Sequence, residues 1–313
     1  MRIVVLAGGI GGARFLRGLK RAAPDSEITV IGNTGDDISL FGLRVCPDLD
    51  TVMYTLGDGI NEEQGWGRRD ESFTVKEELL AYGVGPSWFG LGDRDFATHI
   101  VRTQMLSAGY PLSAVTEALC DRWQPGVRLI PMTDDQVETH VVVTDESGRR
   151  AIHFQEWWVR LRASVPAETI ALVGAEDAKP APGVLEALEE ADTVVVCPSN
   201  PVVSIGPILA VPGVRDTLRA RRERVVGVSP IIAGAPVKGP ADRLMDPLGM
   251  EVSCVGVARA YRDFCSTLVI DAGDASRATE VDALGVHAVV TDTLMRDARV
   301  AAALARNALD AVA

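Results

Sequence analysis

The chain has 313 residues, of which 47% are hydrophobic and 24% charged, and its formal net charge at pH 7 is −12. This composition is typical of a globular protein with an ample core, and the acidic balance argues against nucleic acid or an anionic membrane as the main partner. No apolar run reaches the ~20 residues of a membrane span. Because the sequence starts directly with a predicted strand, we expect no signal peptide. The five cysteines form no CxxC pair, which favours neither zinc nor disulfides and predicts a cytoplasmic protein.

The first fourteen residues combine a strand, a run of glycines and a helix. The apolar run 3–6 predicts a buried strand, and helical spacing begins at Phe15. The glycines between them are Gly8, Gly9, Gly11 and Gly12. This order points backbone N–H groups and a helix N-terminus at an anion, so we expect a phosphate-binding segment. A tight turn without a ligand is the alternative.

The glycine spacing differs from two common nucleotide-binding motifs. Arg14 occupies the third glycine position of the dinucleotide fingerprint, and no Gly-Lys-Ser/Thr follows as in a P-loop. A second strand is predicted at 27–32, and Asn33 follows it where a dinucleotide enzyme would carry an acid. The segment 33–37 therefore binds a ligand at the sheet edge or forms a simple turn.

Four carboxylates lie within fifteen residues of one another. They are Asp36, Asp37, Asp48 and Asp50. Those after Pro47 could cap the helix that begins there. A cluster of this kind beside a phosphate segment repels itself unless a cation lies among the carboxylates, and oxygen ligands with a phosphate suit magnesium. We therefore expect one or two of these acids to bind Mg2+.

The range 57–165 has the pattern of an insertion. Helical spacing recurs at 71–82, 93–102 and 112–123, and it places His99 and Arg102 on one helix face. Trp88 and Phe89 form an aromatic pair in a glycine loop, suited either to packing against a helix or to stacking on a planar ligand.

Strands and a hairpin close the inserted range. A strand is predicted at 128–131, and two further strands flank Asp-Glu-Ser-Gly at 145–148, which is a hairpin signal. His140 and His153 occupy strand positions. Trp157 and Trp158 are interpreted as core residues that anchor a helix.

The second half alternates strands and helices, with strands predicted at 170–173, 193–197, 225–229, 266–270 and 288–291 and a closing helix at 298–313. We therefore expect an α/β, Rossmann-like parallel sheet with helices on both faces. Its core would comprise 1–56 and 166–313, and 57–165 would form an inserted helical and β-hairpin subdomain. Two loops follow predicted strands at the ligand edge: 198–207, with two hydroxyls and an amide, and 229–238, where Lys238 reaches a phosphate or only water.

Several segments match one family in order and spacing. They are Ala-Gly-Gly-Ile-Gly-Gly at 7–12, Cys-Pro-Asp-Leu-Asp-Thr at 46–51, Leu-Gly-Asp-Arg-Asp at 91–95 and Pro-Ser-Asn-Pro-Val-Val-Ser-Ile-Gly at 198–206. Together they resemble the 2-phospho-L-lactate transferase family of coenzyme F-420 biosynthesis. The similarity runs essentially end to end and is greatest to the actinobacterial phosphoenolpyruvate transferase type.

The resemblance implies a specific reaction. An enolpyruvyl-phosphate group would move from enolpyruvyl-diphospho-guanosine to the terminal ribityl hydroxyl of the deazaflavin Fo. GMP would leave, and dehydro coenzyme F-420-0 would form, with Mg2+ as the metal and a homodimer as the assembly. Archaeal members use a lactyl donor instead, and the preference for enolpyruvate rests on overall resemblance alone.

The resemblance and the residue patterns together give a set of expected site residues. Asp50 is expected at the deazaflavin and metal site, with Asp36 as a second metal ligand. The acceptor would also contact Trp88, Phe89, Asp93 and His99. The nucleotide would contact Gly8, Gly9, Gly11, Gly12, Asn33, Ser199, Asn200 and Ser204. Asp50 or His140 would act as general base, unless activation at the metal makes a base unnecessary.

Two other functions fit part of the sequence. The glycine segment and the 33–37 loop also resemble regulators of carbon metabolism that bind a UDP-sugar and catalyse nothing, although the aromatic loop at Trp88 and the long insertion argue against this. A nicotinamide-dependent dehydrogenase is disfavoured by Arg14 and Asn33.

Overall fold

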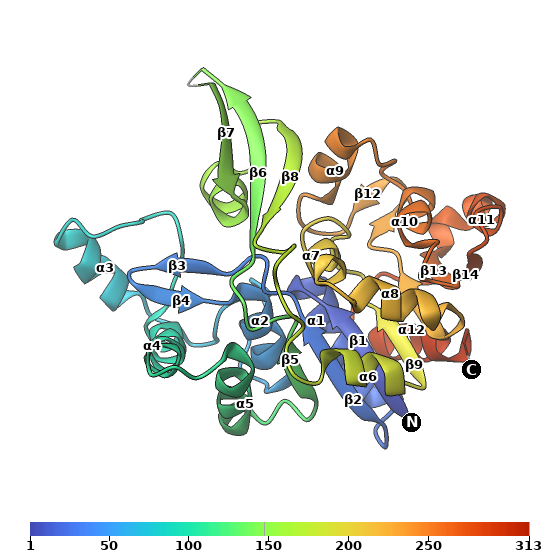
Figure 1. Ribbon diagram of the computed structural model, residues 1–313, viewed down its shortest axis with the longest axis horizontal. Coiled ribbons are helices and arrows are strands. Elements are labelled where there is room, and N and C mark those ends of the chain that lie inside the picture. Colours follow the sequence, from blue (N-terminus) through green and yellow to red (C-terminus); the bar gives the residue numbers. More distant parts are fainter. Residues whose placement is uncertain (147, 313) are drawn as a thin grey trace.

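A computed structural model describes residues 1–146 and 148–312. Its centre is a seven-stranded sheet in the order β14-β13-β10-β9-β1-β2-β5, with every neighbouring pair parallel (Figure 1). The strands are β1 (Arg2–Ala7), β2 (Glu27–Gly32), β5 (Arg128–Pro131), β9 (Thr193–Val196), β10 (Val225–Val228), β13 (Thr267–Asp271) and β14 (His287–Thr291). The predicted Rossmann-like α/β class is confirmed.

Helices cover both faces of this sheet because its strands are buried on both sides. In β1, Ile3 and Val5 belong to one core cluster, and Val4 and Leu6 belong to the other. The first cluster packs under α1 (Gly9–Ala22), α2 (Pro47–Leu56), α5 (Leu112–Trp123) and α12 (Ala298–Asp310). The second packs under α6 (Val184–Glu190), α7 (Ile205–Ala210), α8 (Val214–Ala220) and α10 (Cys254–Tyr261).

The strand order reverses between β1 and β9. From β1 the chain passes through α1 to β2 on one side, and later strands continue from β9 through β10 to β14 on the other side. In open parallel sheets, ligands bind outside the carboxyl ends of the strands at such a switch point. The segments that follow β1 and β9 are therefore the first place to look for a site.

Two strands belong to a different sheet from the one that their position in the sequence predicted. β5, from within the range 57–165, pairs with β2 in the central sheet. β8 (Ala167–Val173), expected in the alternating second half, instead pairs antiparallel with β6 (Glu138–Asp145). Its side chains are mostly half-buried, whereas those of β9 are all buried, which suits β8 to the smaller sheet.

The smaller sheet has three strands, in the order β7-β6-β8, and projects from one end of the molecule (Figure 1). β7 (Gly148–His153) pairs with β6 as the hairpin signal predicted. Part of the predicted turn, residue 147, lies outside the described residues, as does residue 313 of the predicted closing helix. The division of the chain at 57 and 166 stays a prediction.

The remaining elements are short or peripheral. They are β3 (Ile38–Leu40), β4 (Leu43–Val45), α3 (Thr74–Ala81), α4 (Asp93–Ser107), η1 (Glu156–Arg160), η2 (Arg222–Arg224), β11 (Ile231–Ile232), β12 (Ala235–Pro236), α9 (Ala241–Met245), η3 (Asp246–Leu248), η4 (Ala272–Arg277) and α11 (Ala278–Asp282).

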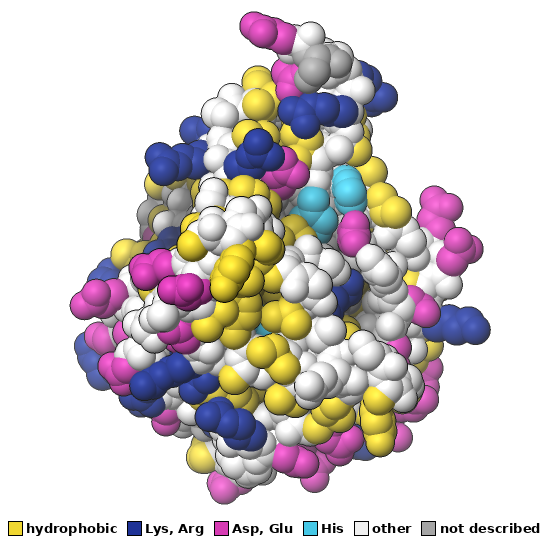
Figure 2. All heavy atoms as spheres, turned by 90° about the vertical axis from the view of Figure 1, so that its left-hand side faces the viewer, with side chains coloured by type: hydrophobic (Ala, Val, Ile, Leu, Met, Phe, Trp, Pro, Cys, Tyr) yellow, Lys and Arg dark blue, Asp and Glu magenta, His cyan; other side chains and the backbone are white. Residues whose placement is uncertain are grey.

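Helix α3 projects from the molecule, and none of its residues is buried. Phe73, Val75, Leu80 and Tyr82 on or beside it are exposed, and Figure 2 shows hydrophobic side chains gathered near the middle of this face. No helix within the described ranges is long and apolar enough to cross a membrane.

Helices α1 and α12 touch at a glycine. A Cβ on Gly18 would lie 2.4 Å from the backbone carbonyl carbon and oxygen of Ala301. Backbone atoms cannot move aside as a flexible side chain can, so Gly18 sets the distance between the two helices.

We expect Gly18→Ala to lower the free energy of unfolding by about 1–3 kcal/mol, because the added methyl group forces α1 and α12 apart. Chemical denaturation measures this change. Arg21→Ala, at an exposed position of the same helix, is the control and should leave stability nearly unchanged. Equal stability of the two variants would contradict the close-packing argument.

Candidate active site

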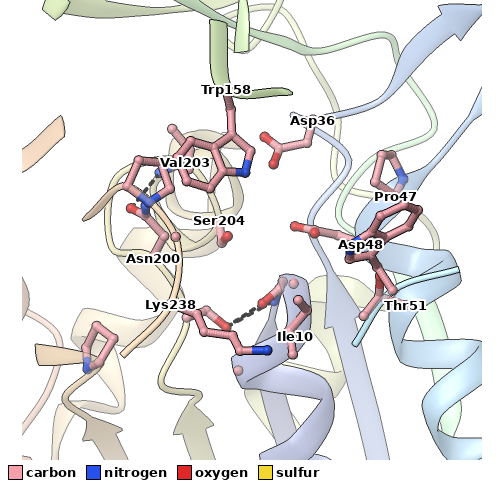
Figure 3. Close-up of a pocket in the computed structure, with 18 of the residues that line it drawn as sticks. Ile10, Asp36, Pro47, Asp48, Thr51, Trp158, Asn200, Val203, Ser204 and Lys238 are labelled. Carbon is pink, nitrogen blue, oxygen red and sulfur yellow. Dashed lines mark hydrogen bonds between the residues drawn. The ribbon is translucent and has the colours of Figure 1, made fainter. Parts of the chain in front are cut away.

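A cavity of about 380 Å³ lies at the carboxyl ends of β1 and β9. The starts of α1 and α2, the loop after β9 and the β11–β12 hairpin surround it (Figure 3). The structure brings ten of the expected site residues to its lining: Gly8, Gly9, Gly11, Asp36, Asp50, Phe89, His99, Ser199, Asn200 and Ser204. The switch point of the sheet is thus the place where most of these residues meet.

The glycines form the start of a helix rather than a flexible loop. β1 ends at Ala7, Gly8 is the N-cap residue, and α1 begins at Gly9. A Cβ on Gly11 would lie 2.4 Å from the carbonyl oxygen of Pro198, and one on Gly8 would lie 2.5 Å from Asp48 Oδ2. Gly8 has no side chain to cap α1, and the N–H of Gly9 is engaged by Asp48. The N–H groups that follow in the first turn are those available to a ligand.

The loop after β9 is tied to the end of β1. Ser199 Oγ donates to the carbonyl oxygen of Gly8 over 2.7 Å, and Asn200 Oδ1 accepts from the N–H of Val202 over 2.9 Å. Ser204 precedes α7 and its side chain points into the cavity (Figure 3). Ser199 and Asn200 therefore shape the loop, and Ser204 presents a hydroxyl to the cavity.

Asn33 forms hydrogen bonds that join the loop after β2, the start of α2 and the loop after β9. Its Nδ2 donates to Asp48 Oδ2 over 2.9 Å and to the carbonyl oxygen of Val203 over 3.1 Å, while its Oδ1 accepts from the N–H of Gly35 over 2.9 Å. It is fully buried and is not among the described residues that line the cavity. These contacts make Asn33 a positioning residue for Asp48, and its contact with the nucleotide stays a prediction.

Asp36 and Asp48 are buried and point into the cavity (Figure 3). Burial raises the pKa of Asp48 to about 6, despite the hydrogen bond from Asn33. Burial, with the charges of Asp48 and Asp37, raises the pKa of Asp36 well above its usual value. Asp36 Oδ1 has no hydrogen-bond partner within the described residues. Two such carboxylates facing one cavity favour a cation between them.

These two acids suit magnesium better than a metal held by protein alone. Across residues 1–146 and 148–312, no group of three or more His, Cys, Asp or Glu side chains is placed to hold a metal. Mg2+ commonly takes one or two carboxylates and completes its shell with water and substrate phosphates. Asp36 was expected as a ligand, whereas Asp48 was noted in the carboxylate cluster but not chosen.

Asp50 instead forms a buried ion pair with Arg102. Arg102 Nη1 donates to Asp50 Oδ2 over 3.1 Å, and Nη2 donates to Oδ1. Arg102 is 1% exposed. Burial opposes its charge, but the charge and hydrogen bond of Asp50, together with Cys46 and Tyr54, raise the pKa of the guanidinium. Asp50 lines the cavity with both oxygens engaged, so its roles as metal ligand and base stay predictions that these contacts do not favour.

His99 belongs to the same buried group. Its Nδ1 lies 3.0 Å from Arg102 Nη1 and 3.8 Å from Asp50 Oδ2. Burial lowers the pKa of His99 to about 4, so the ring is neutral at pH 7 and its Nδ1 can accept a hydrogen bond from Arg102 Nη1. The three-residue spacing of His99 and Arg102 was the sequence signal for this pairing.

Besides Asn33, four expected residues lie outside the described cavity lining: Gly12, Trp88, Asp93 and His140. Gly12 packs beside Ser199, whose Oγ would lie 2.9 Å from an added Cβ, and its contact with the nucleotide stays a prediction. Trp88 packs edge-on against Phe89, with ring centroids 5.7 Å apart. Asp93 accepts from the N–H groups of Thr74 and Val75 and so holds the first turn of α3. His140 contacts Glu138 at 2.9 Å and the ring of His153. Their roles at the acceptor or as base stay predictions.

Other residues complete the lining that the sequence did not single out. They include Tyr54, Trp66, Asp95, Phe154 and Trp158. Trp158 was expected in the core, but it is 37% exposed and overhangs the cavity, whereas Trp157 is buried (Figure 3). The two lie in η1, a π-helical turn, which helical spacing does not reveal.

Asp95 is a further buried acid that lines the cavity. Burial, then the charge of Asp50, raises its pKa to about 7. Its Oδ1 has no hydrogen-bond partner in the described part of the chain. Asp95 therefore lies where a proton could be accepted near neutral pH.

Comparison with known proteins decides the family. The model of the family "2-phospho-L-lactate transferase CofD" matches residues 3–307. The chain belongs to this family. It is therefore a phosphoryl-group transferase of coenzyme F-420 biosynthesis, as the sequence motifs indicated.

Individual relatives agree with this assignment. The chain is 67% identical over 311 residues to a phosphoenolpyruvate transferase of Streptomyces griseus, covering 99% of this chain and 98% of the relative. It is 66% identical over 319 residues to a phosphoenolpyruvate transferase of Thermobifida fusca, and this match covers 99% of this chain and 97% of the relative.

One solved structure resembles the fold. A member of the UPF0052 family from Bacillus halodurans aligns with a TM-score of 0.67 at 18% identity, covering 98% of this chain and 99% of that one. At this identity the likeness bears on the fold alone.

We expect Arg102→Leu to lower the free energy of unfolding by about 3–5 kcal/mol, because Asp50 is left buried without a partner. The double variant Asp50→Asn/Arg102→Leu should recover part of this loss, since the uncompensated charge is gone. Denaturation of the wild type, both single variants and the double variant measures the coupling. If the stability losses of the two single variants add up to the loss of the double variant, the two side chains do not act as a pair.

Proposed function

We propose that this enzyme transfers the enolpyruvyl-phosphate group from enolpyruvyl-diphospho-guanosine to the ribityl hydroxyl of Fo, giving dehydro coenzyme F-420-0 and GMP. The observation that carries the proposal is one cavity that combines a helix start, two buried carboxylates and an aromatic wall. The name of the relatives, phosphoenolpyruvate transferase, supports the enolpyruvyl donor. From the family resemblance we also propose a homodimer that works in the cytoplasm.

The donor's diphosphate would bind at the start of α1. The uncapped first turn there offers N–H groups and the positive end of the helix dipole. Asp36 and Asp48 would hold Mg2+ beside it, and the metal would supply neutralisation of the phosphate charge during transfer. Ser204 and Asn200, on the far side of the same cavity, would contact the guanosine part.

The acceptor's planar ring would bind among aromatic side chains. Four aromatic side chains line the cavity, and one of them, Trp158, lies above it in Figure 3. They are Trp66, Phe89, Phe154 and Trp158. Stacking on rings contributes about 0.5–1.5 kcal/mol beyond burial for each pair. This arrangement supports a flat tricyclic acceptor rather than a simple alcohol.

The chemistry is a displacement at phosphorus. The ribityl oxygen forms a bond to the phosphorus that carries the enolpyruvyl group, while the bond from that phosphorus to the bridging anhydride oxygen breaks. GMP leaves with the bonding electrons, and the hydroxyl proton passes to a base. We assign this base to Asp95, which lines the same cavity as Trp66 and Phe89 and has one oxygen without a hydrogen-bond partner among the described residues. The protein's main contribution is alignment of the two substrates.

The direct test incubates the purified chain with donor, Fo and Mg2+. We expect GMP release only when Fo is present, and mass spectrometry should find the enolpyruvyl diester rather than the lactyl diester, which is two hydrogens heavier. Asp48→Asn should lower turnover about 100-fold because the diphosphate loses its alignment. Asp177→Asn, at an exposed position, is the matched control. Absence of any diester would refute the proposal.

We expect Asp95→Asn to lower kcat by about 10²–10⁴-fold, the usual contribution of a general base. Because the acid must be ionised to accept a proton, wild-type kcat should fall as pH drops below about 7 and level off above it. The variant should lose this pH dependence while keeping the wild-type melting temperature or exceeding it, since a buried charge is removed. A variant with wild-type kcat and the same pH profile would remove Asp95 from the mechanism.

A further inference from the structure

Lys238 lines the cavity from the side of the β11–β12 hairpin. Its side chain extends from the segment after β12 toward Ile10, at the start of α1 (Figure 3). The sequence left open whether this lysine reaches a phosphate or only water. Lys238 is exposed, but its place in the lining of the shared cavity distinguishes it from a lysine on the outer surface.

The hairpin that carries Lys238 is anchored at its base. The N–H of Ala233 donates to Asp274 Oδ2 over 3.0 Å, and Asp274 is buried. Ser229 Oγ contacts the backbone of Ile231 at both its N–H and its carbonyl oxygen. These contacts hold the hairpin beside the cavity, so the lysine is directed there by the fold.

Positive charge gathers on this side of the cavity. The start of α1 carries the positive end of the helix dipole, and Arg14 on the same helix also lines the cavity. Asp50 pairs with Arg102 and Asp37 with Arg44, and within the described ranges no carboxylate pairs with Lys238. A cation beside a helix N-terminus is unfavourable on its own, and an anion between them removes the repulsion.

Negative charge gathers on the opposite side. Asp36 and Asp48 point into the cavity across from Lys238 (Figure 3). Asp36 Oδ1 is buried and has no partner among the described residues, which independently indicates a ligand in the space between. A diphosphate with its cation has the charge pattern that fits: the cation toward the two acids, and free phosphate oxygens toward the lysine.

We propose that Lys238 binds the diphosphate of the nucleotide donor, across the cavity from Asp36 and Asp48. The inference rests on the proposed function in taking the donor to be a guanosine diphosphate derivative. Lys238 forms no covalent bond and transfers no proton; its ammonium group contacts phosphate oxygens. As the anhydride bond breaks and charge collects on the phosphate of departing GMP, this contact stabilises that charge.

Calorimetry with GDP and with guanosine, both in the presence of Mg2+, tests the contact. A hydrogen bond to a charged group contributes enough that Lys238→Gln should weaken GDP binding roughly 10–100-fold. Guanosine, which has no phosphate, should bind the variant and the wild type equally. Lys238→Arg should restore part of the GDP affinity. Lys179→Gln, an exposed lysine with the same charge change, should bind GDP like the wild type.

Two results would overturn the inference. One is unchanged GDP affinity in Lys238→Gln, or a wild type that does not bind GDP. The other is an equal loss for GDP and guanosine, which would indicate a structural role. The transfer assay separates this inference from the proposed function: Lys238-dependent GDP binding without diester formation from Fo would refute the function and leave the phosphate contact standing.

Discussion

The close approach of α1 to its neighbours is the constraint on which the site depends. The first turn of the helix lies so near Pro198 and Asp48 that a side chain at Gly8 or Gly11 does not fit. Because of this contact, the loop after β9 and the start of α2 face the helix N-terminus directly. Asn33 and Ser199 then lock these segments in place through hydrogen bonds to Asp48 and Gly8.

The second organising feature is the separation of charge within an acidic protein. Asp50 is neutralised by Arg102 and Asp37 by Arg44, whereas Asp36 and Asp48 keep no cationic partner among the described residues. The fold thus pairs some buried acids with arginines and leaves two without such a partner, as the proposed binding of a cation with the substrate would require. Burying a carboxylate without a cationic partner lowers stability, so such carboxylates at a cavity indicate a functional site.

Local patterns in the sequence predicted most elements but not how distant ones combine. The strand at 27–32 and the helix at 112–123 were predicted with the bounds that the structure has, because their apolar spacing is strong. The pairing of β5 with β2 and of β8 with β6 depends on contacts between distant segments, which spacing does not encode. The glycine motif was predicted at the ligand edge of the sheet, and the structure places it at the switch point. Its binding of an anion stays a prediction, and its glycines serve close packing as well.

The site shows the same limit. Asp36, Phe89 and Ser204 could be predicted because motif and strand order bring them to one edge. The ion pair between Asp50 and Arg102 could not be predicted, because it joins residues on two helices that only the tertiary fold brings together. Trp158 was misassigned to the core because a π-helical turn changes the direction of side chains relative to an α-helix.

The raised pKa values of Asp36 and Asp48 link the site to the proton concentration of its surroundings. Without a cation, these carboxyl groups hold protons up to higher pH than ordinary aspartates do. A cation requires the ionised form, so loading the site releases protons to solvent. On the proposed function, the apparent affinity for a metal-bound diphosphate would therefore increase with pH across the range near 6, where Asp48 ionises.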